Sequence, residues 1–315
     1  MRMRIAILGG TGFIGTNLAL MLQEQGLEEV FLFDNFQMNP QSARAKVHYP
    51  ITQGDMCNFA ELSDFIQRVQ PDRIYHLAAN SDIQASQSNS QLDVQNTFLS
   101  TEILGHVLCS NPVQELVFAS SSAVYGPKLG RISENEPCNP ISSYGWMKLA
   151  SENVLNNLAE RGIVQKLLIA RFPNVTGSWQ THGVVFDLVA KLKSDSNRLN
   201  VLGNGNQSKP YLLANELVDV ISRIISIQTT NASVVNIAPP SNLTVSEIVN
   251  LIVEKSLLKP ELHYGENDFG WIGDVPRYEL DTRKMNKLLP NFQLTDSLPA
   301  ITAAIEWMWE RSEKD

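Results

Sequence analysis

The sequence contains few cysteines, and their arrangement excludes two kinds of site. Only Cys57, Cys109 and Cys138 occur among the 315 residues, and no two of them form a Cys-x-x-Cys pair. The five histidines form no metal-ligand pattern either. The sequence therefore predicts neither a disulfide framework nor a bound metal, and the reduced cysteines favour a protein of the cytoplasm.

Long apolar runs are also absent. The N-terminal residues lead into an apolar stretch of about five residues, which is too short for the core of a signal peptide. No later run approaches the length of about 20 residues that a membrane-spanning helix requires. We therefore expect neither an export signal nor a membrane partner.

The chain has no excess of positive charge. Its 25 basic residues are outnumbered by 33 acidic ones, the net charge is -8, and the basic residues are scattered along the sequence. A nucleic-acid partner is not expected, because such surfaces concentrate lysine and arginine on one face. A small phosphorylated ligand needs only a local site. With 43% hydrophobic residues, the composition predicts a globular protein with a sizeable core.

Short apolar runs alternate with helical patterns through the first half of the chain. Strand-like runs cover residues 5–8, 30–33, 74–77, 116–119 and 166–170. Helix-like patterns lie between them, for example at residues 12–25, 91–109 and 144–161. This alternation is typical of a parallel sheet covered by helices on both faces, so the sequence predicts a doubly wound α/β fold.

The second half of the chain has a different texture. After Ala170 come turns rich in glycine and asparagine, such as residues 203–206, and one isolated strand-like run at residues 234–238. We interpret this part as a smaller lobe, interleaved with late returns of the chain to the main sheet.

A glycine-rich turn follows the first strand. Its sequence, Gly9-Gly10-Thr11-Gly12-Phe13-Ile14-Gly15, opens the first helix. Glycines at this place let the backbone approach a pyrophosphate, and the helix N-terminus offers free N–H donors and a positive dipole end. A tight packing turn would use the same residues. The position at the start of the first β/α unit favours a dinucleotide site.

Acidic residues follow the second and third strands. Asp34 ends the second strand, where a carboxylate can accept hydrogen bonds from the adenosine ribose. A carboxylate there would repel the 2′-phosphate of NADP, and Asn35-Phe36 offers no cation to offset it, so NAD is favoured. Asp55, followed by Met56, could contact the adenine edge or serve as a plain turn residue.

The candidate catalytic residues lie on a helix and at a strand end. Tyr144 and Lys148 are four residues apart near the start of a predicted helix, so both side chains share one face. Three serines, residues 120–122, follow a core strand at its C-terminal end, where α/β sheets bind ligands. A tyrosine base could take the proton of a sugar hydroxyl while hydride leaves the same carbon. Lowering its pKa by about three units requires about 4 kcal/mol, which a lysine ammonium and an oxidised nicotinamide could supply together.

Five motifs together resemble the extended short-chain dehydrogenases/reductases, within their nucleotide-sugar epimerase and dehydratase group. They are the glycine turn, His76-Leu77-Ala78-Ala79, the serine cluster ending in Val124-Tyr125-Gly126, Tyr144 with Lys148, and Arg171-Phe172-Pro173-Asn174-Val175-Thr176-Gly177. The resemblance covers nearly the whole chain. It implies a Rossmann domain for NAD at residues 1–172 and 213–241, and a smaller α/β lobe for a nucleotide-diphosphate sugar at residues 173–212 and 242–315. It also implies a homodimer formed through helices 91–109 and 144–161.

The resemblance assigns a role to each matching residue. Tyr144 is expected as the base, Lys148 as the residue that binds ribose and tunes Tyr144, and Ser121 as the hydroxyl partner, with Ser122 as the neighbouring alternative. The expected cofactor-binding residues are Gly9, Gly12, Phe13, Ile14, Gly15, Asp34, Asn35, Asp55, Met56, Leu77, Ala78, Ala79, Tyr144, Lys148 and Pro173. The expected substrate-binding residues are Ser81, Ser122, Asn174, Val184, Lys209, Tyr211 and Asp274.

Three later segments are similar to prokaryotic UDP-glucose 4-epimerase-like proteins. They cover residues 181–187, 203–211 and 270–276. Within them, Lys209 stands where family members usually have an arginine of the diphosphate site, and Trp271 replaces another arginine just before Gly-Asp. Lysine offers a point charge instead of a two-pronged fork, so nucleotide binding is expected to differ in strength or in base preference.

The remaining alternatives concern the reaction. Dehydratases of this group carry an acidic residue two positions before the tyrosine of Val-Tyr-Gly, and this chain has Ala123 there. A 4-epimerase acting on a UDP-hexose through a 4-keto intermediate is therefore favoured. Net oxidation to a 4-keto sugar is the alternative, and a non-catalytic NAD-binding regulator is a remote one. His182 is interpreted as a pocket-wall residue and not as a second base.

Overall fold

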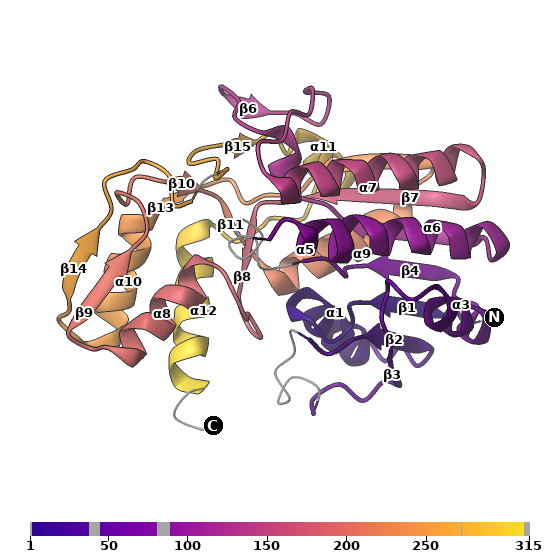
Figure 1. Ribbon diagram of the computed structural model, residues 1–315, viewed down its shortest axis with the longest axis horizontal. Helices are drawn as coiled ribbons and strands as arrows, with labels where there is room; N and C mark the ends of the chain where they lie inside the picture. Colours follow the sequence, from indigo (N-terminus) through magenta and orange to yellow (C-terminus); the bar gives the residue numbers. More distant parts are fainter. Residues whose placement is uncertain (1, 38–44, 81–88, 272, 312–315) are drawn as a thin grey trace.

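A seven-stranded parallel sheet organises the larger part of the molecule (Figure 1). The computed structural model describes residues 2–37, 45–80, 89–271 and 273–311. The strand order is β12-β7-β5-β4-β1-β2-β3. The bounds are β1 Ile5–Leu8, β2 Val30–Asp34, β3 Ile51–Gln53, β4 Arg73–His76, β5 Val113–Ala119, β7 Val164–Arg171 and β12 Ala232–Asn236. The order reverses between β1 and β4. The connections that leave the carboxyl ends of these two strands therefore run in opposite directions and leave a crevice between them.

Helices cover both faces of the sheet, because side chains alternate along each strand. Ile5 and Ile7 of β1 pack into one core with α1 (Phe13–Glu24) and α9 (Ala214–Ile227). Ala6 and Leu8 pack into the opposite core, which includes side chains from the helices α3 Phe59–Val69, α6 Ser100–Ser110 and α7 Ser143–Glu160. The predicted doubly wound α/β fold is confirmed.

The helix predicted at residues 91–109 has an internal irregularity. It begins as α5 (Gln91–Asp93), widens into a π-helical segment η1 (Val94–Leu99), and continues as α6. Side chains stabilise the wider turn, since the Thr97 carbonyl accepts hydrogen bonds from the Thr101 hydroxyl at 2.8 Å and the Ser151 hydroxyl at 3.2 Å. Insertions of this kind often mark functional sites.

A smaller α/β lobe is formed mainly by the second half of the chain, at the left of Figure 1. Its core is shared by three helices, α8 Val184–Ser194, α10 Val245–Ser256 and α12 Ser297–Arg311. Its strands β9 (Arg198–Val201) and β14 (Glu261–Tyr264) pair in parallel. The remaining elements are η2 Ser122–Tyr125, β6 Arg131–Ile132, β8 Asn174–Thr176, β10 Ser208–Lys209, β11 Tyr211–Leu213, β13 Leu243–Thr244, β15 Glu279–Leu280 and α11 Arg283–Leu288.

Candidate active site

One cavity of about 770 Å³ brings together residues of the main sheet and of the smaller lobe. Its wall includes Gly9 and Leu77, which directly follow β1 and β4, at the point where the strand order reverses. Of the predicted site residues, Ser81 lies outside the described residues. The others all line this cavity: Gly9, Gly12, Phe13, Ile14, Gly15, Asp34, Asn35, Asp55, Met56, Leu77, Ala78, Ala79, Ser121, Ser122, Tyr144, Lys148, Pro173, Asn174, Val184, Lys209, Tyr211 and Asp274.

The glycine turn leaves room for a ligand at the N-terminus of α1. Gly9 has a φ of +79°, and a Cβ built there would lie 2.7 Å from the Ala78 nitrogen. A Cβ on Gly15 would lie 2.2 Å from the Gly9 oxygen, so both positions need glycine for packing. A Cβ on Gly12 would meet only the Gly9 oxygen at 3.5 Å. Because no side chain caps α1 at Gly12, this helix N-terminus suits a pyrophosphate, and the residues fit a dinucleotide cofactor.

Asp34 has a structural role in the same turn. Its carboxylate accepts hydrogen bonds from the backbone N–H of Thr11 at 2.9 Å and of Phe36 at 2.8 Å. Phe36 has a φ of +64°, a backbone conformation that residues other than glycine rarely adopt. The hydrogen bond from the Phe36 N–H therefore stabilises a strained turn. Each carboxylate oxygen can accept a second hydrogen bond. Asp34 can therefore hold the turn and still accept a ribose hydroxyl from the cavity.

Asp55 also combines a turn with a place on the cavity wall. Its side chain accepts from the Cys57 N–H at 2.8 Å, and its own N–H donates to Glu61 at 2.8 Å. Met56, next to it, is buried. The turn interpretation of Asp55 thus has direct hydrogen-bond support, while its contact with an adenine stays a prediction.

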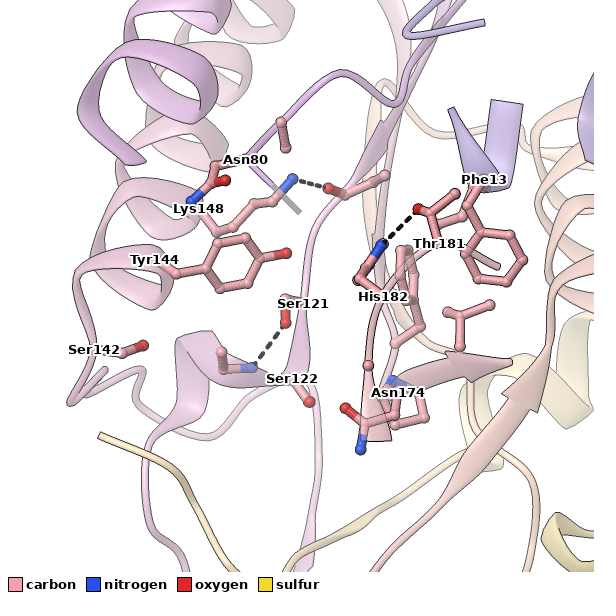
Figure 2. Close-up of a pocket in the computed structure, with 18 of the residues that line it drawn as sticks. Phe13, Asn80, Ser121, Ser122, Ser142, Tyr144, Lys148, Asn174, Thr181 and His182 are labelled. Atoms are coloured by element: carbon pink, nitrogen blue, oxygen red, sulfur yellow. Dashed lines mark hydrogen bonds between the residues drawn. The ribbon is translucent and has the colours of Figure 1, made fainter. Parts of the chain in front are cut away.

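Tyr144, Lys148 and Ser121 converge on the centre of the cavity (Figure 2). Tyr144 and Lys148 extend from the first turns of α7, whose N-cap Ser142 accepts from the Gly145 N–H at 3.2 Å. Ser121 lies just beyond the end of β5 and caps η2 by accepting from the Ala123 N–H at 3.2 Å. In Figure 2 the Tyr144 ring directs its hydroxyl toward the region of Ser121.

The electrostatics of this group differ from the prediction. Burial raises the pKa of Tyr144, and a hydrogen bond with Ser121 opposes the rise. Burial lowers the pKa of Lys148 to about 7. Lys148 donates a 2.6 Å hydrogen bond to the Ala119 carbonyl and does not by itself bring the pKa of Tyr144 down. In the protein alone, both side chains are thus driven toward their neutral forms.

The two adjacent serines have different partners. Ser121 opposes the rise in the pKa of Tyr144, whereas Ser122 opposes the rise in the pKa of Tyr278. Tyr278 is a cavity residue that the sequence analysis missed. Its burial raises its pKa, so it is a neutral hydroxyl at physiological pH. The only sequence signal for it is its place four residues after Asp274.

The cavity wall in the smaller lobe contains a buried ion pair. Lys209 and Asp274 contact each other directly, with side chains that are 14% and 5% exposed. Asp274 also accepts from the Gly270 N–H at 3.2 Å. Both residues were predicted from the sequence to bind the substrate. Their pairing, in which the charge of Lys209 offsets that of Asp274, was not predicted. Burial raises the pKa of Tyr211, nearby, and Asn174 opposes this rise.

His182 lies on the cavity wall, as the sequence analysis expected. Its Nδ1 is 3.1 Å from the Thr181 hydroxyl, and its ring meets the Phe13 ring edge-on with 6.3 Å between centroids (Figure 2). His182 therefore links the loop before α8 to the first residue of α1. Its chemical role stays a prediction.

The described residues contain neither a group of metal-binding side chains nor a membrane-spanning helix. Across residues 2–37, 45–80, 89–271 and 273–311, no three histidine, cysteine or acidic side chains come together in a way that could hold a metal ion. Within the same ranges, no helix is both long and apolar enough to span a bilayer.

Sequence comparison identifies similar proteins. Residues 5–238 match the model of the NAD dependent epimerase/dehydratase family. The uncharacterized UDP-glucose epimerase YtcB of Bacillus subtilis is 28% identical over 277 residues, covering 85% of this chain and 87% of that protein. GDP-6-deoxy-D-talose 4-dehydrogenase of Aggregatibacter actinomycetemcomitans is 26% identical over 302 residues, covering 95% of each chain.

Solved structures of the same shape include a UDP-galactose 4-epimerase. It superimposes with a TM-score of 0.87 at 26% identity, covering 98% of this chain and 99% of the other. The structure of MoeE5 in complex with UDP-glucose and NAD superimposes with a TM-score of 0.86 at 26% identity, covering 99% and 100%. The described fold therefore matches that of a protein solved with a nucleotide sugar and NAD.

Proposed function

The chain belongs to the NAD-dependent epimerase/dehydratase family, and from that premise we propose that it is a UDP-hexose 4-epimerase acting through a transient 4-keto sugar. One observation carries the proposal. Ser121, Tyr144 and Lys148 meet in the cavity that also contains the open N-terminus of α1, and Ala123 stands where dehydration would need an acid. The site can thus move a proton and a hydride but lacks this second acid/base group.

The cofactor is NAD, and the residues that would hold it are those of the glycine turn, Asp34 and Lys148. When bound, NAD supplies reversible hydride transfer at a sugar carbon and a positive ring charge that favours a nearby phenolate. The N-terminus of α1 would bind the pyrophosphate through its free N–H groups. Asp34 would accept from the ribose hydroxyls, and this carboxylate would select against an added 2′-phosphate.

The protein groups then act on the sugar. Tyr144 accepts the proton of the 4-hydroxyl as the C4–H bond breaks, and Ser121 holds the same oxygen by hydrogen bonding. The product of this half-reaction is the 4-keto sugar. If the keto sugar turns within the cavity, Tyr144 would give the proton back to the same oxygen, and the bound cofactor would supply the hydride exchange at C4. General acid/base assistance of this kind contributes about 10²–10⁴-fold to a rate.

Net 4-oxidation is a second candidate with an observation in its favour. The relative from Aggregatibacter actinomycetemcomitans is named a 4-dehydrogenase and matches 95% of this chain. A dehydrogenase performs the same first half-reaction with the same residues. It differs in releasing the 4-keto sugar and the reduced cofactor.

We also propose how the chain is divided and assembled. Residues 1–172 and 213–241 would form the NAD-binding domain, and residues 173–212 and 242–315 the nucleotide-sugar lobe. A homodimer would form through helices α5 to α7. In support, the apolar residues Val94 and Leu99 of η1 are 40% and 37% exposed. The scattered cysteines are compatible with the cytoplasm.

The test is turnover of a panel of nucleotide sugars. Purified protein would be incubated with UDP-, GDP-, CDP- and dTDP-hexoses, and products would be resolved by NMR. We expect a UDP-hexose to reach equilibrium with its 4-epimer, identified by the coupling constants of the C4 proton. Turnover of a different nucleotide series, or a product changed at another carbon, would contradict the proposed substrate and reaction.

A further inference from the structure

The ammonium group of Lys148 lies in a dry part of the site. Lys148 is 2% exposed, and its Nζ lies 4.8 Å from the centre of the Phe118 ring and 5.7 Å from that of the Tyr144 ring. Among the described residues, Nζ donates one hydrogen bond, to the Ala119 carbonyl at 2.6 Å. Burial lowers the pKa of Lys148 to about 7, so at neutral pH a nearby anion can decide whether this lysine keeps its charge.

Glu152 is such an anion, and it lies one turn further along the same helix. It is 2% exposed, and both carboxylate oxygens are hydrogen-bonded. One oxygen accepts from the Ser120 hydroxyl at 2.5 Å and from Arg171 Nε at 2.9 Å, and the other accepts from Arg171 Nη2 at 2.5 Å. Ser120 follows β5 and Arg171 ends β7. Glu152 therefore joins α7 to the ends of the two strands that precede Ser121 and Pro173.

The groups that face Lys148 come from several elements, and only two of them are acids. On α7 are Glu152 and Tyr144, on α5 is Asp93, and on β4 is His76, which burial and Lys148 together keep neutral with a pKa of about 3. Both acids raise the pKa of Lys148, and Glu152 is the larger influence. Asp93 also raises the pKa of Tyr144, whereas Glu152 is not among the groups that shift it. Glu152 is thus the acid that can favour the ammonium without opposing the base.

We propose that Glu152 is a positioning residue of the active site, whose buried carboxylate orients the serine cluster through Ser120 and supplies the negative charge that keeps Lys148 an ammonium. The assignment rests on the proposed function, because it concerns the residues given catalytic roles there. Glu152 acts through Ser120 and Lys148 and does not touch the reacting atoms. Without it, Lys148 loses its proton at a lower pH, and the site loses a cation that faces the base.

The direct test follows the Lys148 side chain and not the reaction. The ε-carbons of the lysines are labelled with ¹³C in the full chain, and the signal absent from Lys148→Arg identifies Lys148. Its chemical shift is titrated by NMR without and with NAD. In Glu152→Gln we expect the titration midpoint of Lys148 to fall by about one pH unit or more. An unchanged midpoint would overturn the proposal even if the enzyme proved to use another substrate.

The kinetic test uses the pH dependence of kcat. Loss of the Lys148 proton should reduce the rate at high pH, so Glu152→Gln should fall behind the native enzyme progressively as the pH rises. A merely structural role would reduce the rate by the same factor at every pH. If the native enzyme turned over no nucleotide sugar at all, the proposed function would fail, while the NMR titration would still decide the role of Glu152.

Two further variants separate charge from folding. Glu152→Gln leaves Arg171 buried without a counter-charge, so the double variant with Arg171→Met removes both charges of the pair. The double variant also removes the positive charge of Arg171, so its midpoint should lie between that of Glu152→Gln and that of the native protein. Return of the native midpoint in the double variant would overturn the proposal.

Glu115→Gln is the matched control. Glu115 also forms a buried pair, with Arg73, whose side chains are 9% and 8% exposed, and it contacts Lys166 as well. It lies near the start of β5, at the other end of the strand from Ala119. This variant should lose stability without moving the Lys148 titration. A shift in this control as large as in Glu152→Gln would show that any broken buried pair has the same effect, and would contradict a specific role for Glu152.

Discussion

Among single residues, the neighbouring serines Ser121 and Ser122 affect two different tyrosines of the cavity. Ser121 lowers the pKa of Tyr144 and Ser122 lowers that of Tyr278, each against the larger effect of burial, although the two serines are adjacent in the chain. The start of η2 at Ser122 turns the backbone between them, so their hydroxyls point to different partners. This arrangement supports Ser121 as the partner of the base and leaves Ser122 for substrate contact.

Substitution of the base and its partner should have graded effects. Tyr144→Phe removes the proton acceptor and should lower kcat by about two to four orders of magnitude, with unchanged NAD binding. Ser121→Ala should cost less, because the base remains. Ser122→Ala, the matched control, should mainly raise KM. Steady-state kinetics and a cofactor titration measure these effects, and a Tyr144→Phe enzyme retaining more than a tenth of the rate would place the base elsewhere.

The position of Asp34 on the cavity wall predicts that the protein prefers NAD to NADP. Its carboxylate is held at the cavity wall by the N–H groups of Thr11 and Phe36, so it cannot easily turn away from a ligand. A 2′-phosphate would meet this negative charge, and NADP should bind more weakly than NAD. The dissociation constants of the two cofactors can be compared by fluorescence titration. Equal or tighter binding of NADP would refute the assignment of Asp34.

At the scale of secondary structure elements, the β1–α1 turn separates packing from ligand binding. Gly15 is needed because any side chain would collide with the Gly9 oxygen at 2.2 Å. Gly12 has an extended conformation that alanine can adopt, with φ of -69° and ψ of 179°, and the space beside it belongs to the cavity. The two glycines therefore serve the same element for different reasons.

Two alanine substitutions test this distinction. Gly12→Ala should lower the stability of the protein without cofactor by no more than about 1 kcal/mol, since it only changes an N-cap, but should weaken NAD binding about tenfold or more. Gly15→Ala should cost about 1–3 kcal/mol of stability because the backbone must move. Urea unfolding and NAD titration distinguish them. An equal loss of stability in both variants would contradict the described turn.

The elements also show which features can be predicted from sequence. The apolar run at residues 5–8 coincides with β1 because a strand covered on both faces must be apolar throughout. Strand β4 begins one residue before its predicted run, at Arg73. This charged residue can be buried in the strand because it forms an ion pair with Glu115. The π-helical segment depends on Thr97 contacts, including one from Ser151 on another helix. Hydrophobic periodicity carries no information about such contacts.

The same limit applies to the site. Motifs that are local in sequence, such as the glycine turn and Tyr144 with Lys148, predict the cofactor and catalytic residues before the fold is known. The pair of Lys209 with Asp274 joins positions 65 residues apart, and Tyr278 reaches Ser122 from near the end of the chain. These contacts arise only when the smaller lobe folds against the sheet, so the electrostatics of the substrate end could not be predicted.

At the scale of the whole molecule, residues of the glycine turn and residues of the smaller lobe line the same cavity. An epimerase benefits from this enclosure, because the hydride taken from the sugar must return to the same carbon before the keto sugar escapes. Each cycle then regenerates NAD, which need not leave. A dehydrogenase with the same cavity would end every cycle with the reduced cofactor and would have to release it or pass the hydride to another substrate.

The measurement that tests epimerisation most directly is multiple turnover with bound NAD alone. Protein carrying one equivalent of NAD is supplied with an excess of the UDP-hexose, while NMR follows the sugar and absorbance at the wavelength of reduced nicotinamide follows the cofactor. The account predicts many turnovers to the 4-epimer without accumulation of NADH. A single stoichiometric burst of NADH together with a 4-keto product would contradict it and make the enzyme a 4-dehydrogenase.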